Sequence, residues 1–391
     1  MPSHESIQYG IDRYLGYKPG SDRIAFVTND AATTSLLTLS RVALLKSGFK
    51  LVKLFSPEHG ISAQGADGEF QFDSKDEITG LPVISLYGER LAPTEEDLQD
   101  VDMVIFDIPD VGCRFYTYQW TLSYIMQTCS KLNKRLLVLD RPNPLSGNLE
   151  LIEGPMLEAS CASFIGRWNI ALRHSCTIGE LSLLWKQQYC PGLNIDIVPV
   201  KGWSRNLFFD DLSLPFVPTS PGIPDFSNAL LYPGMGLLEG INVSEGRGTT
   251  LPFRVCGAPW VKSGRLSDAF NDFEVPGVIS KPYSFQPVSG RYAGEYCNGI
   301  MLHVTNKHLF HPVFSGWMLM KLMMDHYPDK IQLHLYKTRA NPSGENHLDK
   351  LLGIRNSFAC LQDDGLFTES IEKINVVENW RRTIASFLLY K

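Results

Sequence analysis

The strongest constraint on the fold is a series of short apolar runs in the first 150 residues. They occupy residues 23–29, 51–55, 83–86, 103–106 and 136–139, and turn residues bound each one. Short, continuously apolar runs are typical of strands that helices cover on both faces. A helical pattern begins near residue 31, and residues 116–132 are long enough for a crossover helix. Repeated strand–helix units favour a doubly wound parallel sheet, so we expect an α/β fold.

The alternation becomes irregular beyond about residue 150. The chain has 391 residues, and at about 150 residues per domain we expect two domains, over 1–150 and 151–391. Thr177 and Glu180 have the spacing of a capping box, which predicts a helix over 177–188. Residues 195–200 form a further predicted strand. The Pro/Gly-rich region 214–259 is too long for an ordinary connection, and its aromatic and aliphatic residues predict an ordered functional surface.

Composition excludes several classes of protein. Lys and Arg number 36 against 42 Asp and Glu, giving a net charge of -6, which argues against a nucleic-acid partner. No apolar run approaches the ~20 residues that a membrane span requires. The first residues resemble no signal peptide, so we expect a cytoplasmic protein, or a periplasmic or secreted one if a leader has been removed. The eight scattered cysteines are expected to be buried thiols.

Polar side chains follow each predicted strand directly. In a parallel sheet these positions meet at one edge, where α/β proteins bind their ligands. They include Asn29 after the first strand, Glu58 and His59 after the second, Tyr87 after the third, Asp110 and Arg114 after the fourth, and Arg141 and Asn143 after the fifth. This topology predicts a site that contains carboxylates, a histidine and arginines.

Common cofactor and metal motifs are missing from the sequence. The turn after the first strand, residues 28–33, contains no glycine, so a dinucleotide fingerprint is absent. Residues 244–250 (SEGRGTT) lack the Walker lysine, and no G-x-S-x-G elbow occurs. His308 and His311 stand three apart without a nearby carboxylate motif. We therefore expect neither a cofactor nor a metal ion.

Carboxylate chemistry is the remaining possibility. Glu58 lies between Pro57 and Gly60, which fix the direction of the intervening side chains. Desolvation against Phe55 and Tyr87 would raise the pKa of Glu58 and make it a general acid. The alternative interpretation is a structural glutamate that caps a helix or forms a salt bridge. Hydrolysis of a glycoside needs a second carboxyl group. The candidates for it are Glu239, Glu245 and Asp110.

Nine motifs in order carry a family resemblance. They are 56–60 (SPEHG), 86–88 (LYG), 106–112 (FDIPDVG), 139–144 (LDRPNP), 173–174 (RH), 232–234 (YPG), 238–240 (LEG), 244–250 (SEGRGTT) and 257–260 (GAPW). The chain resembles glycoside hydrolase family 171, formerly domain of unknown function 1343, which contains exo-acting β-N-acetylmuramidases. The resemblance implies a Rossmann-like N-terminal domain, a smaller C-terminal α/β domain and an active site in the cleft between them.

The resemblance also implies an activity, the release of β-1,4-linked N-acetylmuramic acid from the non-reducing end of peptidoglycan fragments. The family's proposed catalytic glutamate corresponds to Glu58. We expect Glu58 to be the acid and prefer Glu245 as the second carboxyl over Glu239. An inverting, a retaining and an acetamido-assisted mechanism all stay open. A non-catalytic binder of cell-wall sugars is the alternative function, and a transferase would require a nucleotide motif that we do not find.

N-Acetylmuramic acid carries a lactyl carboxylate, so a selective site needs a fixed cation. Arginine suits this role because its planar fork can bind a carboxylate through two hydrogen bonds. We consider Arg247, Arg141 and Arg114, in that order. His59 and His174 are expected to bind the sugar or orient the carboxylates, with a structural role as the alternative. Asn29, Tyr87, Asp110, Asn143 and Glu239 complete the candidates for substrate binding.

Overall fold

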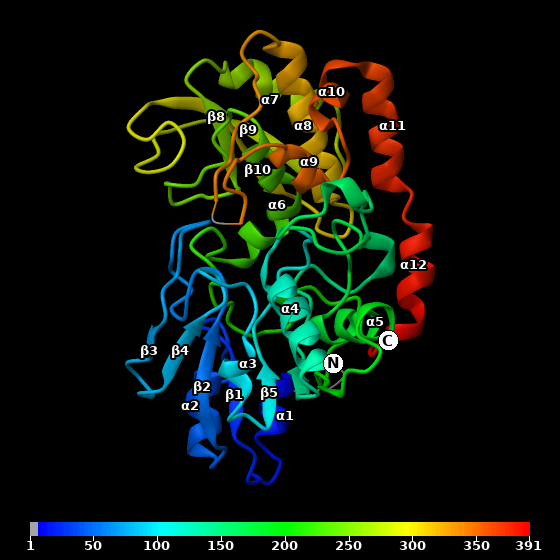
Figure 1. The fold of residues 1–391 in the computed structure, drawn as a ribbon. Helices are drawn as coiled ribbons and strands as arrows, with labels where there is room; N and C mark the ends of the chain where they lie inside the picture. The colour runs from blue at the N-terminus through cyan, green and yellow to red at the C-terminus, as the bar shows by residue number, and fades with distance from the viewer. Residues whose placement is uncertain (1–6, 339) are drawn as a thin grey trace.

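The computed structural model describes residues 7–338 and 340–391, which form two domains (Figure 1). The first domain contains a seven-stranded sheet in the order β3-β4-β2-β1-β5-β6-β7. The strands are β1 (Ile24–Val27), β2 (Leu51–Ser56), β3 (Ser74–Lys75), β4 (Pro82–Ser85), β5 (Met103–Phe106), β6 (Arg135–Leu139) and β7 (Ile195–Val198). Pairing is parallel throughout except between β3 and β4. The six parallel strands have the strand order of a Rossmann fold, which confirms the expected fold class.

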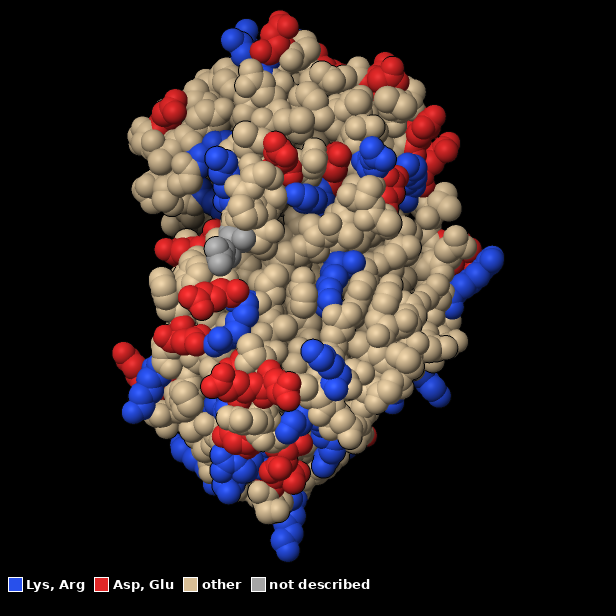
Figure 2. Space-filling model, in the orientation of Figure 1, with Lys and Arg blue, Asp and Glu red and all other residues tan. Residues whose placement is uncertain are grey.

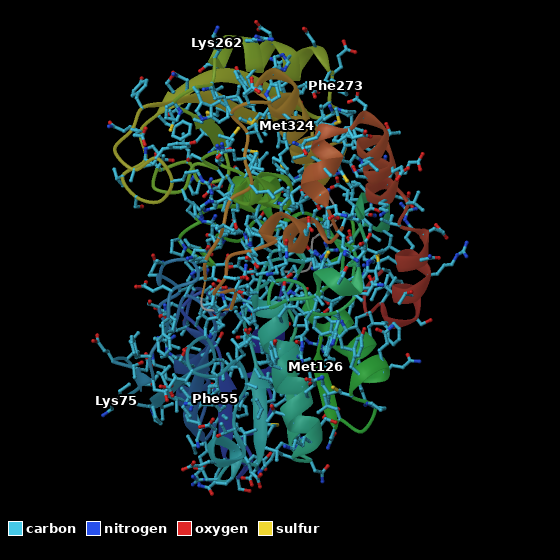
Figure 3. All side chains as sticks on the ribbon, turned by 45° about the horizontal axis from the view of Figure 1, so that its top comes forward. Phe55, Lys75, Met126, Lys262, Phe273 and Met324 are labelled. Carbon is cyan, nitrogen blue, oxygen red and sulfur yellow. The ribbon has the colours of Figure 1, made fainter. Side chains whose placement is uncertain are left out.

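Helices cover both faces of this sheet. They are α1 (Gly10–Tyr14), α2 (Ser40–Lys46), α3 (Glu95–Leu98), α4 (Tyr118–Lys131) and α5 (Ile178–Tyr189). Alternate residues of β1 enter two separate cores, Ile24 and Phe26 on one face and Ala25 and Val27 on the other. Figure 3 shows Phe55 inside the sheet domain and Lys75 at its outer edge. Burial on both faces explains why the strands are continuously apolar.

Two sequence expectations about this domain need correction. β7 hydrogen-bonds to β6, so the boundary expected near residue 150 falls inside the sheet domain. The helix expected from residue 31 begins only at Ser40. The residues before it form a tight loop in which Leu37 has a φ of +63° and Leu36 is 87% exposed. The capping box of Thr177 and Glu180 is present at the start of α5, as expected.

The second domain is built on a small antiparallel sheet. Its strands β8 (Val255–Ala258), β9 (Val278–Phe285) and β10 (Cys297–Val304) lie in the order β8-β10-β9. Its helices are α6 (Phe226–Met235), α7 (Ser263–Asp272), α8 (Pro312–His326), α9 (His347–Leu352), α10 (Ser357–Gln362) and α11 (Asp364–Asn375). α8 is buried along most of its length, so the apolar stretch around Trp317 does form a core helix. The region 214–259 is ordered and contains α6 and β8.

The chain returns to the first domain at its C-terminal end. α11 packs against α8 in the second domain, whereas η5 (Ala385–Phe387), which follows α12 (Glu378–Ile384), contacts α5 in the first (Figure 1). The Tyr390 hydroxyl donates to Asp140 Oδ2 at 2.5 Å and accepts from the Val200 amide at 2.9 Å. The polypeptide therefore crosses between the domains twice, once before α6 and once between α11 and α12.

Four short 3₁₀ helices complete the described secondary structure: η1 (Leu149–Leu151), η2 (Ala159–Cys161), η3 (Phe209–Asp211) and η4 (Gly236–Gly240). All eight cysteines are buried and free, as the sequence analysis expected. No helix in the described ranges has the length and apolar character needed to cross a bilayer. On the face shown in Figure 2, basic side chains lie among acidic ones over both domains.

Candidate active site

A cavity of about 420 Å³ lies between the two domains. This volume is within the usual range of small-molecule sites, roughly 300–1,000 Å³. Glu58, His59 and Tyr87 line it from the first domain, and Glu239 and Arg247 line it from the second. The structure thus brings together five of the residues that the sequence analysis selected.

The loop after β2 directs Glu58 toward the cavity. His59 and Gly60 have φ angles of +68° and +72°, so the chain turns sharply immediately after the glutamate. The His59 ring stabilises this turn, because its Nδ1 lies 2.8 Å from the carbonyl oxygen of Gly65. The turn places the Glu58 carboxyl group against the start of α4, and the residue as a whole is only 5% exposed.

Neutral donors hold the Glu58 carboxyl group. The Thr117 hydroxyl donates to Oε2 at 2.7 Å, and the Gly68 amide donates to Oε1 at 3.0 Å. Burial and the negative charge of Glu58 raise the pKa of Tyr87, so the Tyr87 hydroxyl stays protonated in the same cavity. No salt bridge to Glu58 forms among the residues that the structure describes. The structural interpretation, a helix-capping or salt-bridged glutamate, therefore does not match the contacts of Glu58.

Burial raises the pKa of Glu58 above its usual value, and the negative charge of Asp67 raises it further. His59 and the hydrogen bonds from Thr117 and Gly68 act in the opposite direction but do not outweigh burial. Glu58 therefore holds its proton at a higher pH than an ordinary glutamate does, which is what a general acid requires.

Asp67 is the neighbouring carboxyl group with the opposite behaviour. Its side chain is 30% exposed, and although partial desolvation favours its neutral form, Arg247, His59 and a hydrogen bond from the Tyr336 hydroxyl together lower the pKa of Asp67. One guanidinium nitrogen of Arg247 lies 3.5 Å from Asp67 Oδ1. The cavity thus contains one carboxyl group that tends to stay protonated and one that tends to stay ionised.

Arg247 is the centre of an acidic cluster on the second domain. Its Nη1 lies 2.5 Å from Glu239 Oε1 and 3.2 Å from Glu245 Oε1, and its guanidinium packs 4.7 Å from the Phe253 ring centroid. Burial raises the pKa of Glu245. Glu245 is not among the residues that line the cavity, so the preferred second carboxyl lies behind Arg247 rather than facing a ligand.

The other two candidate arginines are structural and do not line the cavity. Arg114 is fully buried and donates to four backbone carbonyls, those of Pro155, Ile170, Leu351 and Leu352. These carbonyls belong to both domains, so Arg114 joins them. Arg141 instead forms a buried ion pair with Asp107, with Nε 2.6 Å from Oδ1.

The remaining candidates stabilise the loops at the strand ends and do not line the cavity either. Asp110 accepts from the Gly112 amide at 2.8 Å and lies 3.4 Å from Nε2 of His174. The side-chain amide of Asn143 donates to the Cys176 carbonyl, and Asn29 Oδ1 accepts from the Ala31 amide. His174 is fully buried beside Asp110 and lies outside the cavity lining.

Several residues that line the cavity were not selected from the sequence. They are Asp67, Thr117, Tyr336, His347 and Lys350, among others. Most lie in loops or helices that follow no parallel strand, so their place in the sequence does not mark them as residues of the strand-end site. Asp67 could have been selected from the sequence, because it lies between Gly65 and Gly68 shortly after the Glu58 motif.

Two loops meet over the cavity and join the domains. In Figure 1 the blue loop after β2 rises to the orange segment that precedes α9. The Tyr336 hydroxyl donates to Asp67. Gly68 packs so closely that a Cβ atom there would lie 2.6 Å from Thr338 Cγ2. We call these contacts between the 66–68 and 336–338 segments the loop bridge.

No cluster of three or more His, Cys, Asp or Glu side chains in the described ranges could hold a metal ion. The cavity does contain carboxyl groups with divergent pKa values, hydrogen-bonding side chains and aromatic rings, including Tyr232 and Phe253. These are the elements from which acid–base glycosidases are built.

A Rossmann-type domain and a smaller domain that enclose a carboxylate-lined cavity define a two-domain enzyme of the glycosidase class. Family models described as "Exo-beta-N-acetylmuramidase NamZ", N-terminal and C-terminal, match residues 24–227 and 230–390. The chain belongs to the NamZ exo-β-N-acetylmuramidase family.

Individual relatives agree with this assignment. The chain is 42% identical over 330 residues to the peptidoglycan β-N-acetylmuramidase NamZ of Bacillus subtilis (strain 168), covering 83% of this chain and 79% of the relative. The structure is similar to two crystal structures of DUF1343 family proteins from Bacteroides fragilis NCTC 9343. One gives a TM-score of 0.87 at 29% identity over 98% of this chain and 99% of the other, and the second gives 0.73 at 26% identity over 99% of each.

Proposed function

We propose that this protein is an exo-acting glycosidase that releases N-acetylmuramic acid from the non-reducing end of peptidoglycan fragments. Its membership of the NamZ family supports the substrate class. The single observation that supports the chemistry is the pairing of Glu58 with Asp67, whose pKa values shift in opposite directions within one cavity. Such a pair provides an acid and a base at the same pH.

In the proposed reaction, Glu58 donates its proton to the glycosidic oxygen as the bond between that oxygen and C1 breaks. The anomeric carbon develops positive charge, which the ionised Asp67 stabilises electrostatically. A water molecule then forms the new bond to C1 and loses a proton to a carboxylate of the site. The products are free N-acetylmuramic acid and a saccharide shortened by one residue.

Asp67 replaces Glu245 in this proposal for a geometric reason. Asp67 lines the cavity and its charge acts directly on Glu58, whereas Glu245 lies outside the lining. Glu239 also lines the cavity, but it is bonded to Arg247 and lies 3.4 Å from His347 Nε2. We therefore assign Glu239 to holding Arg247 and His347 in place.

The test is direct. The protein is incubated with a disaccharide that carries N-acetylmuramic acid at its non-reducing end, and free sugars are separated by chromatography. We expect release of N-acetylmuramic acid by the wild type and none by Glu58→Gln. Binding of the disaccharide without release by the wild type would instead identify a sugar-binding protein and contradict the proposed activity.

A further inference from the structure

The substrate proposed above carries a negative charge, and among the residues that the structure describes the cavity offers few cations free to meet it. Arg247 contacts three carboxyl groups, those of Glu239, Glu245 and Asp67. One guanidinium cannot neutralise more than one unit of negative charge. A further carboxylate placed beside Arg247 would meet repulsion from groups that already surround it.

Lys350 is a cation of a different kind. Its ammonium donates to Asn341 Oδ1 at 2.8 Å and to the Glu345 carbonyl oxygen at 2.9 Å, which are both uncharged acceptors. Lys350 forms no salt bridge with a carboxylate in the described part of the chain. Burial is the main influence on it and lowers the pKa of Lys350, and the charge of the Glu345 carboxylate offsets this only in part.

The geometry of Lys350 leaves room for one more acceptor. A lysine ammonium has three N–H donors, and the two neutral acceptors occupy only two of them. Lys350 and Asn341 both line the cavity. The remaining N–H donor of Lys350 is therefore next to the space that a ligand would fill. His347, one turn earlier on α9, lines the same cavity and faces Glu239.

We propose that Lys350 binds the lactyl carboxylate of N-acetylmuramic acid and that Asn341 and the Glu345 carbonyl hold its ammonium in place. This inference rests on the proposed function and names the residue that separates a muramyl from a glucosaminyl sugar. It assigns to α9 the role that the sequence analysis gave to an arginine. Arg247 then organises the carboxyl groups of the cavity.

The experiment measures how much the negative charge of the lactyl carboxylate contributes to ligand affinity. Free N-acetylmuramic acid and its neutral lactyl amide are compared as inhibitors of the hydrolysis of a chromogenic β-N-acetylmuramide. For the wild type we expect the acid to inhibit about tenfold more strongly than the amide, as a hydrogen-bonded ion pair allows. Lys350→Gln should remove this preference, and Lys350→Arg should retain most of it.

A matched control removes the same charge outside the cavity. Lys262 is exposed on the second domain (Figure 3) and is not part of the lining, so Lys262→Gln should leave the preference unchanged. A preference that survives in Lys350→Gln, or that is equally lost in Lys262→Gln, would overturn the assignment of Lys350. Both results leave the proposed activity intact, because that activity fails only if the wild type releases no N-acetylmuramic acid.

Discussion

The two walls of the cavity carry glutamates that are equally buried but differently bonded. Glu58 on the first domain and Glu239 on the second are each 5% exposed. Glu58 receives hydrogen bonds from neutral groups, among them Thr117 and Gly68, whereas Glu239 is bonded to the guanidinium of Arg247. The comparison teaches that burial alone does not decide the role of a carboxyl group. The partners differ in role as well as in charge, because the bonds of Glu239 hold Arg247 and His347 in place.

The largest expected effect comes from replacing the carboxyl group of the first wall. Glu58→Gln keeps the size of the side chain and an oxygen to accept from Thr117, but it cannot donate an acidic proton. We expect kcat on a chromogenic β-N-acetylmuramide to fall by about 10³ to 10⁴, at the upper end of the usual contribution of general acid catalysis. Glu239→Gln is the matched change on the second wall, and an equal loss of kcat there would remove the contrast between the walls.

A large effect on stability is expected where one side chain joins the two walls. Arg114→Met removes donors to four buried carbonyl oxygens from both domains. We expect the free energy of unfolding to decrease by about 3 kcal/mol, since buried acceptors lose their partners. Urea denaturation followed by tryptophan fluorescence measures this. Arg382→Met changes an exposed arginine and should leave the midpoint nearly unchanged.

A smaller effect is expected from removing the negative charge of Asp67. Asp67→Asn removes the negative charge that raises the pKa of Glu58. Glu58 would then lose its proton at a lower pH, so the alkaline limb of kcat/KM should move to lower pH. We expect at least about a tenfold loss of activity, because the variant also loses the charge that stabilises the developing positive charge at the anomeric carbon. An alkaline limb that stays in place would show that Asp67 does not act on the essential acid.

The smallest effect is expected at Thr117, and its sign is opposite. The Thr117 hydroxyl stabilises the ionised form of Glu58 and lowers its pKa. Thr117→Val removes this hydrogen bond, so Glu58 should keep its proton to higher pH and the alkaline limb should move upward. We expect plateau activity within about threefold of the wild type. A shift in the same direction as Asp67→Asn would contradict this account of the Glu58 environment.

The sequence predicted the sheet domain well because strands buried on both faces leave a continuous apolar signature. It also located Glu58, His59 and Tyr87, since parallel strands end at a common edge. The start of α2 was missed because Leu36 and Leu37 imitate a helical pattern while lying exposed in a loop. Asp67, Tyr336 and Lys350 reach the cavity only through the packing of loops and α9 across the domains, and no local pattern encodes that packing.

The second passage of the chain along α11 and α12 is one of several ties between the two walls of the cavity. The buried core continues from the first domain into the second, where the rings of Phe115 and Tyr232 lie 5.0 Å apart. Arg114 adds hydrogen bonds to carbonyl oxygens of both domains. Two covalent links and one shared core resist a change in the angle between the walls, so the acid on one wall and the cations on the other would be pre-positioned before a saccharide arrives.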